Sequence, residues 1–348
     1  MTRAVPHRDP KRPQAPERPR EPKRPQERGV ILLTVMLIVA VMAALSVAIV
    51  DDIRFGLRRT TNMALYDQAF WYGVGLEEFA KLAAARSYEF NAEVSTLSDP
   101  WAQEAVRFPI PGGLIEGSLA DGGACFNLNS LVDPSAEGQA SQDADAVQQF
   151  SALLRALDVP QADHMGIINA ITDWIDVDNT PLPRGAEDYA YTNLQPPYRT
   201  GDARLADVSE LRAIQGVGEV LYRTLRPFVC ALPNNAPNAI NVNTLEPRDA
   251  PLLQMLLGAR IDRAAAEAII FDRPDEGFRT VEEFWNLKAL ETARPPLEAR
   301  PIIETRTQYF DLTARVLYEE AYFQLRSSFY LDTGGRISLV SRTFGADE

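Results

Sequence analysis

The sequence has few of the residues on which nucleophilic and zinc-dependent catalysis depend. It contains two histidines, His7 and His164, and two cysteines, Cys125 and Cys230, among 348 residues. A Ser/His/Asp or Cys/His catalytic set could draw only on His164 outside the N-terminal leader. A zinc site rich in histidine or cysteine is excluded because its ligands are missing. We expect His164, which lies beside Asp163 in a helical pattern, to be a surface residue.

The first 28 residues have almost no apolar side chains. Proline stands at every third position from Pro10 to Pro25, which prevents a helix and favours an extended chain. Residues 1–29 carry nine Lys or Arg and four Asp or Glu, whereas the rest of the chain carries 26 basic and 44 acidic residues. We interpret residues 1–29 as a disordered leader. The acidic body disfavours nucleic acid and anionic lipid as partners, and it suits a divalent cation.

Charge is also absent from residues 30–50. As a helix, these 21 residues would be about 30 Å long, which matches the hydrocarbon core of a bilayer. The positive-inside rule places the basic leader in the cytoplasm and residues 51–348 outside. An uncleaved anchor or a conventional signal peptide would share these features. Apolar residues then recur at helical spacing as far as residue 86, so we expect one helix over 30–86.

The remaining sequence predicts an antiparallel sheet whose strands are separated by a long helical segment. Alternating apolar residues and Gly-containing turns indicate strands over 106–110, 115–121, 124–128, 309–317, 322–331 and 336–342. Helical patterns occupy 145–157, 164–175, 208–213, 219–228, 247–257, 263–271 and 281–285. Gly216-Val217-Gly218 resembles a helix-hairpin-helix turn, which could offer N–H groups to DNA phosphate. The acidic surroundings favour a purely structural hairpin.

The densest polar motif is an acidic loop over residues 173–191, with five acids within sixteen residues. Ca²⁺ prefers six to eight oxygen ligands, which such a loop could supply. Four residues fall on EF-hand offsets, but Pro181 stands where an EF-hand needs glycine, so we predict a different calcium fold. A solvated acidic loop without metal is the alternative. The candidate ligands are Asp176, Asp178, Glu187 and Asp188, together with Thr180 and Asp173.

That acidic cluster could also serve a metal-dependent hydrolase. Such an enzyme would need an open coordination position and a general base in a pocket, and nothing else in the sequence supplies them. Two asparagine-rich strings, 127–130 and 238–244, favour turn and helix capping over metal binding. Cys125 and Cys230 lie outside the membrane in this topology, where disulfides persist, and pairing is favoured over two free thiols.

The junction between leader and apolar run has the form of a known processing site. Arg28-Gly29-Val30 resembles the site of prepilin peptidase, which would cut after Gly29 and leave the apolar helix, starting at Val30, on the mature chain. Residues 29–86, and most specifically RRTTN…DQAFWYGVGLEEFAK, resemble the stem of K-type minor pseudopilins of type II secretion systems. Major pseudopilins have Glu at the fifth mature position. This chain has Thr34 there, and in lacking the acid it resembles K-type subunits.

The resemblance implies an α+β fold. A type IV pilin-like N-terminal helix would pack on a small antiparallel sheet, and a large α-helical domain of SAM-like or helix-hairpin-helix character would be inserted. The implied parts are a cleaved cytoplasmic leader (1–29), a transmembrane segment (30–50), the stem and first strands (51–129), the inserted domain (130–304) and the C-terminal strands (305–348).

The same resemblance implies a structural protein and not an enzyme. It implies a minor pseudopilin at the pseudopilus tip, which starts and caps assembly for protein export across the outer membrane. Its partners would be I- and J-type minor pseudopilins, the major pseudopilin, prepilin peptidase and exoprotein substrates. The chain would cross the bacterial inner membrane once, lie mostly in the periplasm, carry a methylated N-terminus and bind Ca²⁺ in the acidic loop. A membrane-tethered helix-hairpin-helix DNA receptor is the alternative, which the acidic body disfavours.

Overall fold

The computed structural model describes residues 28–103, 105–133 and 142–345. The prediction of a disordered leader therefore lies outside the described residues. The chain divides into two units, one ending at Thr61 and one beginning at Asn62, and we describe each by itself.

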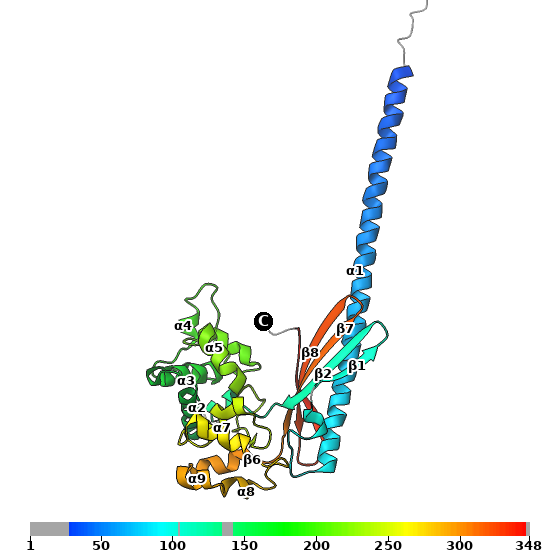
Figure 1. Ribbon diagram of the computed structural model, residues 1–348. Coiled ribbons are helices and arrows are strands. Elements are labelled where there is room, and N and C mark those ends of the chain that lie inside the picture. Colours follow the sequence, from blue (N-terminus) through cyan, green and yellow to red (C-terminus); the bar gives the residue numbers. More distant parts are fainter. Residues whose placement is uncertain (1–27, 104, 134–141, 346–348) are drawn as a thin grey trace, which may run out of the picture. The chain divides into compact units, whose positions relative to one another are not determined.

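Helix α1 extends from Arg28 to Phe90 without a break (Figure 1). It is four residues longer at its C-terminal end than the apolar pattern predicts. Residues 30–50 are exposed along their whole length, although they are apolar. Among the described residues, α1 is the helix long and apolar enough to cross a membrane. This agrees with a single N-terminal anchor.

In the second unit, a five-stranded antiparallel sheet has the strand order β1-β2-β7-β8-β9. The alternation in the sequence predicts each of these strands to within two residues at either end. The strands are β1 (Val106–Ile110), β2 (Gly113–Asp121), β7 (Tyr309–Tyr318), β8 (Ala321–Leu331) and β9 (Ile337–Phe344).

One face of this sheet packs against the C-terminal part of α1 (Figure 1). Two glycines permit the close approach. A Cβ at Gly73 would come within 2.7 Å of the Phe323 ring, and one at Gly117 would come within 2.5 Å of the Leu76 side chain. Burial of this interface supplies the main apolar stabilisation of the pilin-like part. The buried residues on α1 are Ala69, Leu76, Ala80 and Ala84, and those on β7 are Phe310, Leu312, Ala314 and Val316.

A charged side chain, Glu77, lies inside this apolar interface and is fully buried. Arg342 donates two hydrogen bonds of 2.7 Å to its carboxylate. Ser327 donates a third at 2.7 Å, and Lys81 lies 3.0 Å away. Burial would raise the pKa of Glu77, but these partners outweigh it and lower the pKa to about 2. The group ties α1 to β8 and β9.

Between β2 and β7 the chain forms what we call the helical region, residues 122–308. It has its own hydrophobic core. Its α-helices are α2 (Ala144–Ala156), α3 (Gln161–Ile175), α4 (Asp188–Tyr191), α5 (Glu219–Leu225), α6 (Ala250–Leu256), α7 (Arg263–Phe271), α8 (Val281–Trp285) and α9 (Lys288–Ala293). The 3₁₀ helices here are η2 (Leu128–Leu131), η3 (Val208–Ala213), η4 (Arg226–Phe228), η5 (Pro247–Asp249) and η6 (Leu297–Ile302), and η1 (Pro100–Ala102) precedes β1.

One strand prediction for this region is wrong. Residues 124–128 do not join the main sheet. Instead β3 (Phe126–Asn127) pairs in parallel with β4 (Val229–Cys230), because Asn127 and Asn129 hold the chain against the helical region. A second short parallel pair joins β5 (Ile240–Asn241) to β6 (Ile303–Glu304). The segment 208–213 is helical, as the sequence predicts, and the helix is of the 3₁₀ type.

His164 is buried and not on the surface, with 2% of its area exposed. One ring nitrogen lies 3.2 Å from the Ser151 hydroxyl, and the other lies 2.9 Å from the Val159 carbonyl oxygen. The prediction failed because α3 packs on α2, so most of the α3 circumference is covered. The imidazole closes the turn between the two helices.

Candidate functional site

The acidic loop joins the C-terminal end of α3 to the start of α4. Asp176 is the C-cap of α3, and Glu187 precedes the first residue of α4. A helix C-terminus carries partial negative charge and normally attracts cationic side chains. The carboxylates of Asp173 and Asp176 at this end are therefore the reverse of the stabilising pattern. The loop needs positive charge from elsewhere.

Three carboxylates converge in this loop. One oxygen each from Asp176, Asp178 and Glu187 lie within 4.8 Å of one another. Asp176 is 2% exposed and Glu187 is 1% exposed. None of the four carboxylate oxygens of Asp176 and Glu187 accepts a well-formed hydrogen bond from the described residues, and the Asp178 N–H only partly opposes the rise in the pKa of Asp176. Buried anions without partners are strongly unfavourable, so this geometry fits a bound cation.

The electrostatics of this carboxylate cluster point the same way. Burial raises the pKa of Asp176 to about 7, and the charges of Asp178 and Asp173 add to the effect. Burial also raises the pKa of Glu187 to about 7, with the charge of Asp176 as the next cause. A divalent ion would reverse the sign of these interactions. Hard oxygen donors of this kind suit Ca²⁺.

The other predicted ligands have different surroundings. Asp173 is fully buried and accepts hydrogen bonds of 3.1 and 3.2 Å from the Leu182 N–H. Burial raises its pKa. A Cβ at Gly185 would lie 2.0 Å from its carboxylate, so glycine is required there. Asp173 thus shapes the loop from inside. The exposed Thr180 donates its backbone N–H to Asp178 at 2.7 Å.

Asp188 lies outside the carboxylate cluster. Its carboxylate accepts bonds from the Thr200 hydroxyl at 2.9 Å and the Thr200 N–H at 3.0 Å. Arg199 forms an ion pair with it at 3.0 Å. The Thr200 hydroxyl is the main cause of its lowered pKa. Sequence reasoning missed Asp202, whose charge acts on both Asp176 and Glu187. It follows a Pro-Pro turn, and no spacing motif indicated it.

The asparagine-rich strings brace the backbone, as capping residues do. The side chain of Asn127 accepts the Asn129 N–H at 3.2 Å and caps η2. The Asn129 amide exchanges hydrogen bonds with the backbone of Leu205 and also reaches the Leu232 carbonyl oxygen. The side-chain amide of Asn243 likewise exchanges hydrogen bonds with the backbone of Phe278: its NH₂ donates to the Phe278 carbonyl oxygen and its oxygen accepts from the Phe278 N–H. Cys125 and Cys230 form a disulfide beside the β3–β4 pair.

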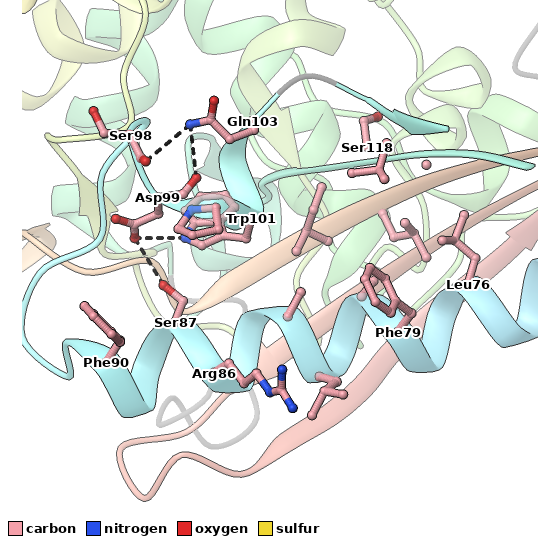
Figure 2. A pocket seen from close by; sticks show the side chains of 18 of the residues that line it. Leu76, Phe79, Arg86, Ser87, Phe90, Ser98, Asp99, Trp101, Gln103 and Ser118 are labelled. Atoms are coloured by element: carbon pink, nitrogen blue, oxygen red, sulfur yellow. Dashed lines mark hydrogen bonds between the residues drawn. The ribbon is translucent and has the colours of Figure 1, made fainter. Parts of the chain in front are cut away.

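A second candidate site is an apolar groove of about 540 Å³ on the pilin-like part. Figure 2 shows it between the last turns of α1 and the segment from Ser98 to Ser118. We call it the stem groove. Phe90 is 96% exposed and Phe79 is 50% exposed at its rim. Trp101 forms part of its floor, held by a 3.0 Å bond from its indole N–H to Asp99. Exposed apolar patches of this kind are typical of protein, membrane or ligand contact surfaces.

The predicted processing site lies in the first turn of α1, which begins at Arg28. Thr34 lies one turn further on. Its hydroxyl donates within its own helix, to the carbonyl oxygens of Val30 at 3.0 Å and Ile31 at 2.9 Å. The fifth residue after Gly29 therefore offers neither charge nor a free hydroxyl to a neighbouring chain.

A charge-free helix of bilayer length, which continues into a stem packed on an antiparallel sheet, defines a pilin-like subunit. The comparisons with known proteins identify which kind. Family models described as "Type II secretion system (T2SS), protein K" match residues 124–234 and 240–301. Type II secretion system protein K of Pectobacterium carotovorum is 33% identical and aligns with 92% of this chain and 97% of its own. The Klebsiella pneumoniae protein K is 34% identical, with the same two coverages.

A solved structure agrees with these matches. A chain of the GspK-GspI-GspJ complex from enterotoxigenic Escherichia coli superposes with a TM-score of 0.73 at 31% identity, covering 83% of this chain and 100% of that one. The chain belongs to the protein K family of type II secretion systems. It is therefore a minor pseudopilin, with the mixed α+β fold that its sequence predicts.

Proposed function

We propose that this chain forms the tip of the pseudopilus, where it starts and caps the assembly that exports proteins across the outer membrane. The observation that supports this is Thr34, whose hydroxyl is bonded within its own helix. In a pilin stack, an acid at this position neutralises the amino terminus of the neighbouring subunit within lipid, where an unpaired charge is costly. A subunit that lacks the acid has no electrostatic reason to enter the stack beneath another. Its role is structural and not catalytic.

Immunogold labelling tests the tip position. Antibody against the helical region should mark one end of each pseudopilus. As a control, antibody against the major pseudopilin should mark the whole shaft. Label for this chain along the shaft would contradict the proposal. Thr34→Glu should restore the missing charge, and label should then spread into the shaft.

The stem groove is the surface that we propose for a sister minor pseudopilin of I or J type. A chain of this family has been solved in a complex with two such proteins, and the groove exposes Phe79, Leu82 and Phe90 on one side of α1. A neighbouring apolar stem would cover these side chains. The major pseudopilin and exoproteins would then bind to the assembled tip. Prepilin peptidase would act earlier, by cleaving the leader of this chain.

We propose further that the carboxylate cluster binds Ca²⁺ through Asp176, Asp178 and Glu187. Asp202 adds negative charge, and Asp173 shapes the loop. The support is the pair of buried carboxylates, Asp176 and Glu187, without hydrogen-bond partners. When bound, Ca²⁺ would supply the missing positive charge and cross-link the end of α3 to the start of α4. Its role would be to fix the loop, not to activate water.

Thermal unfolding of the detergent-solubilised chain tests this calcium site. Binding to the folded state alone should stabilise the chain by about 2.7 kcal/mol when Ca²⁺ exceeds its Kd a hundredfold. Asp178→Ala with Glu187→Ala should remove most of the difference between Ca²⁺ and chelator. Glu267→Ala with Asp272→Ala, two exposed acids on α7 and its C-cap, should retain it. Identical melting of the unmodified chain in Ca²⁺ and in chelator would contradict the proposal.

A further inference from the structure

The chain enters and leaves the helical region at one place, beside the shared end of β2 and β7. Asp121 is the last residue of β2, and Thr307 lies two residues before β7. Asn241 and Thr244 come from within the helical region, at the end of β5 and just after it. We call these four residues the junction cluster. Asp121 is partly exposed, whereas each of the other three is at most 4% exposed, so the cluster is largely closed to solvent.

Both oxygens of the Asp121 carboxylate accept hydrogen bonds. Oδ1 accepts the Gly123 N–H at 2.7 Å. Oδ2 accepts the Thr244 hydroxyl at 2.5 Å and the Thr307 hydroxyl at 2.7 Å. The Asn241 amide in turn donates to the Thr307 hydroxyl oxygen at 3.0 Å. The junction cluster therefore joins the sheet to two segments of the helical region that are far apart in sequence.

The Thr244 hydroxyl has two acceptors within reach but only one hydrogen to donate. Its oxygen lies 2.5 Å from Asp121 Oδ2 and 3.0 Å from the Asn241 carbonyl oxygen. When Asp121 is ionised, the hydroxyl can donate to only one of them. When Asp121 carries a proton, it can donate to Thr244, and Thr244 can then donate to Asn241, while Thr307 still donates to Asp121. The protonated acid therefore permits one more hydrogen bond than the ionised acid.

The electrostatics of Asp121 also favour its protonated form. Burial raises the pKa of Asp121 from 3.8 to about 6, although the hydroxyls of Thr244 and Thr307 oppose this rise. The negative charge of Asp311, on the adjacent strand β7, adds to it. Ionisation of Asp121 thus places a charge in a poorly solvated site, close to a second carboxylate.

Other charged residues lie on the segments around the junction cluster. The Arg273 guanidinium donates to the carbonyl oxygens of Val242 and Leu245, and Arg306 donates to the Ala92 carbonyl oxygen. The charge of Arg326 on β8 acts on Asp311. The acids on these segments are Glu93, Glu246 and Glu304. Asp311 remains the charged residue with the largest effect on Asp121.

We propose that Asp121 is a pH-sensitive switch at the attachment of the helical region to the sheet. With its proton, Asp121 completes the hydrogen bonds from β2 through Thr244 to Asn241. Without the proton, these bonds are incomplete and a charge faces Asp311. Because the pKa is raised, the stabilising contribution of Asp121 is complete below pH 3.8 and is lost as pH rises through about 6. The attachment is therefore tighter at pH 5 than at pH 8, whether or not the chain binds Ca²⁺.

Hydrogen–deuterium exchange of the full-length chain in detergent tests this inference. The reporters are the Gly122 N–H, which donates to the Tyr309 carbonyl oxygen, and the Val242 N–H, which donates to that of Glu304. After correction for the intrinsic pH dependence of exchange, their protection should fall by at least about tenfold between pH 5 and pH 8. Asp121→Asn has no proton to lose, so its reporters should keep the same protection at both pH values.

Asp145→Asn is the matched control, because it removes an exposed acid at the start of α2. It should retain the fall in protection. The amides of α5, within the helical region, should keep their protection at both pH values. Constant protection of the reporters in the unmodified chain would overturn the inference. The same fall in Asp121→Asn, or a fall that extends to α5, would also overturn it.

A second variant covers the case in which Asp121→Asn does not fold. The carboxylate cluster also has pKa values of about 7, at Asp176 and Glu187. Asp178→Ala with Glu187→Ala should therefore retain the fall in protection at the reporters. If the fall disappears in this variant, it originates in the carboxylate cluster and the inference is wrong.

Discussion

Glu77 is a buried charged residue that joins the stem to the sheet. Its fully buried carboxylate joins α1 to β8 and β9 through Ser327 and Arg342. The sequence could not indicate it. Glu77 and Glu78 are adjacent acids on one helix, and only the packed structure shows that the first is buried and the second is 65% exposed.

We predict that Glu77→Gln lowers the free energy of unfolding by about 3 kcal/mol at neutral pH. The pKa of Glu77 is lowered from 4.5 to about 2, so its stabilising contribution is complete above pH 4.5 and is lost as pH falls towards 2. The difference between the variant and the unmodified chain should therefore shrink over that range. Urea unfolding at several pH values measures it. Glu78→Gln is the control and should change stability little; an equal loss in both variants would contradict the prediction.

The carboxylate cluster shows how much of a site can be predicted from residue types. The density of acids and the Pro/Gly loop indicated Asp176, Asp178 and Glu187 correctly as neighbours. Spacing could not separate Asp188, which pairs with Arg199 and Thr200, and it could not include Asp202. Those two differences depend on how the loop closes after residue 191, which is a tertiary property.

At the scale of elements, periodicity predicted the parts that bury one face. The inner strands β2, β7 and β8 and the C-terminal part of α1 follow their apolar patterns because one face of each is buried. The short parallel pairs β3–β4 and β5–β6 have two residues in each strand, too few to show any period. They are held by buried asparagine amides and by the disulfide. The same amides explain why residues 124–128 leave the main sheet.

We predict that Cys125→Ala with Cys230→Ala destabilises the helical region by about 2–4 kcal/mol, because the disulfide closes a loop with a sequence separation of 105 residues. Thermal unfolding should show a lower transition for the variant. The reductant-treated unmodified chain should melt like the variant, and the variant itself should not respond to reductant. If the variant unfolds at the same temperature as the oxidised, unmodified chain, the disulfide contributes little to stability.

At the scale of the whole chain, we predict cleavage between Gly29 and Val30, with methylation of the new amino group. The reason is the basic residue and glycine before an apolar helix that remains on the mature chain. Intact-mass analysis of protein purified from membranes should give a chain that starts at Val30 and carries one added methyl group. Gly29→Leu should retain the leader, whereas Thr34→Ala should be processed normally. A mature N-terminus between residues 45 and 60 would contradict the pilin-like topology.

β2 and β7 are adjacent antiparallel strands, and Asp121 pairs with Phe310 at their shared end. The Gly122 N–H donates to the Tyr309 carbonyl oxygen at 2.9 Å. Topologically, the whole helical region therefore occupies the place of a hairpin turn. Because its two ends meet, its addition to an ancestral pilin would have cost little more than the entropy of closing a loop, which rises slowly with length. The fold could thus acquire a domain larger than its own sheet without changing the register of a single strand.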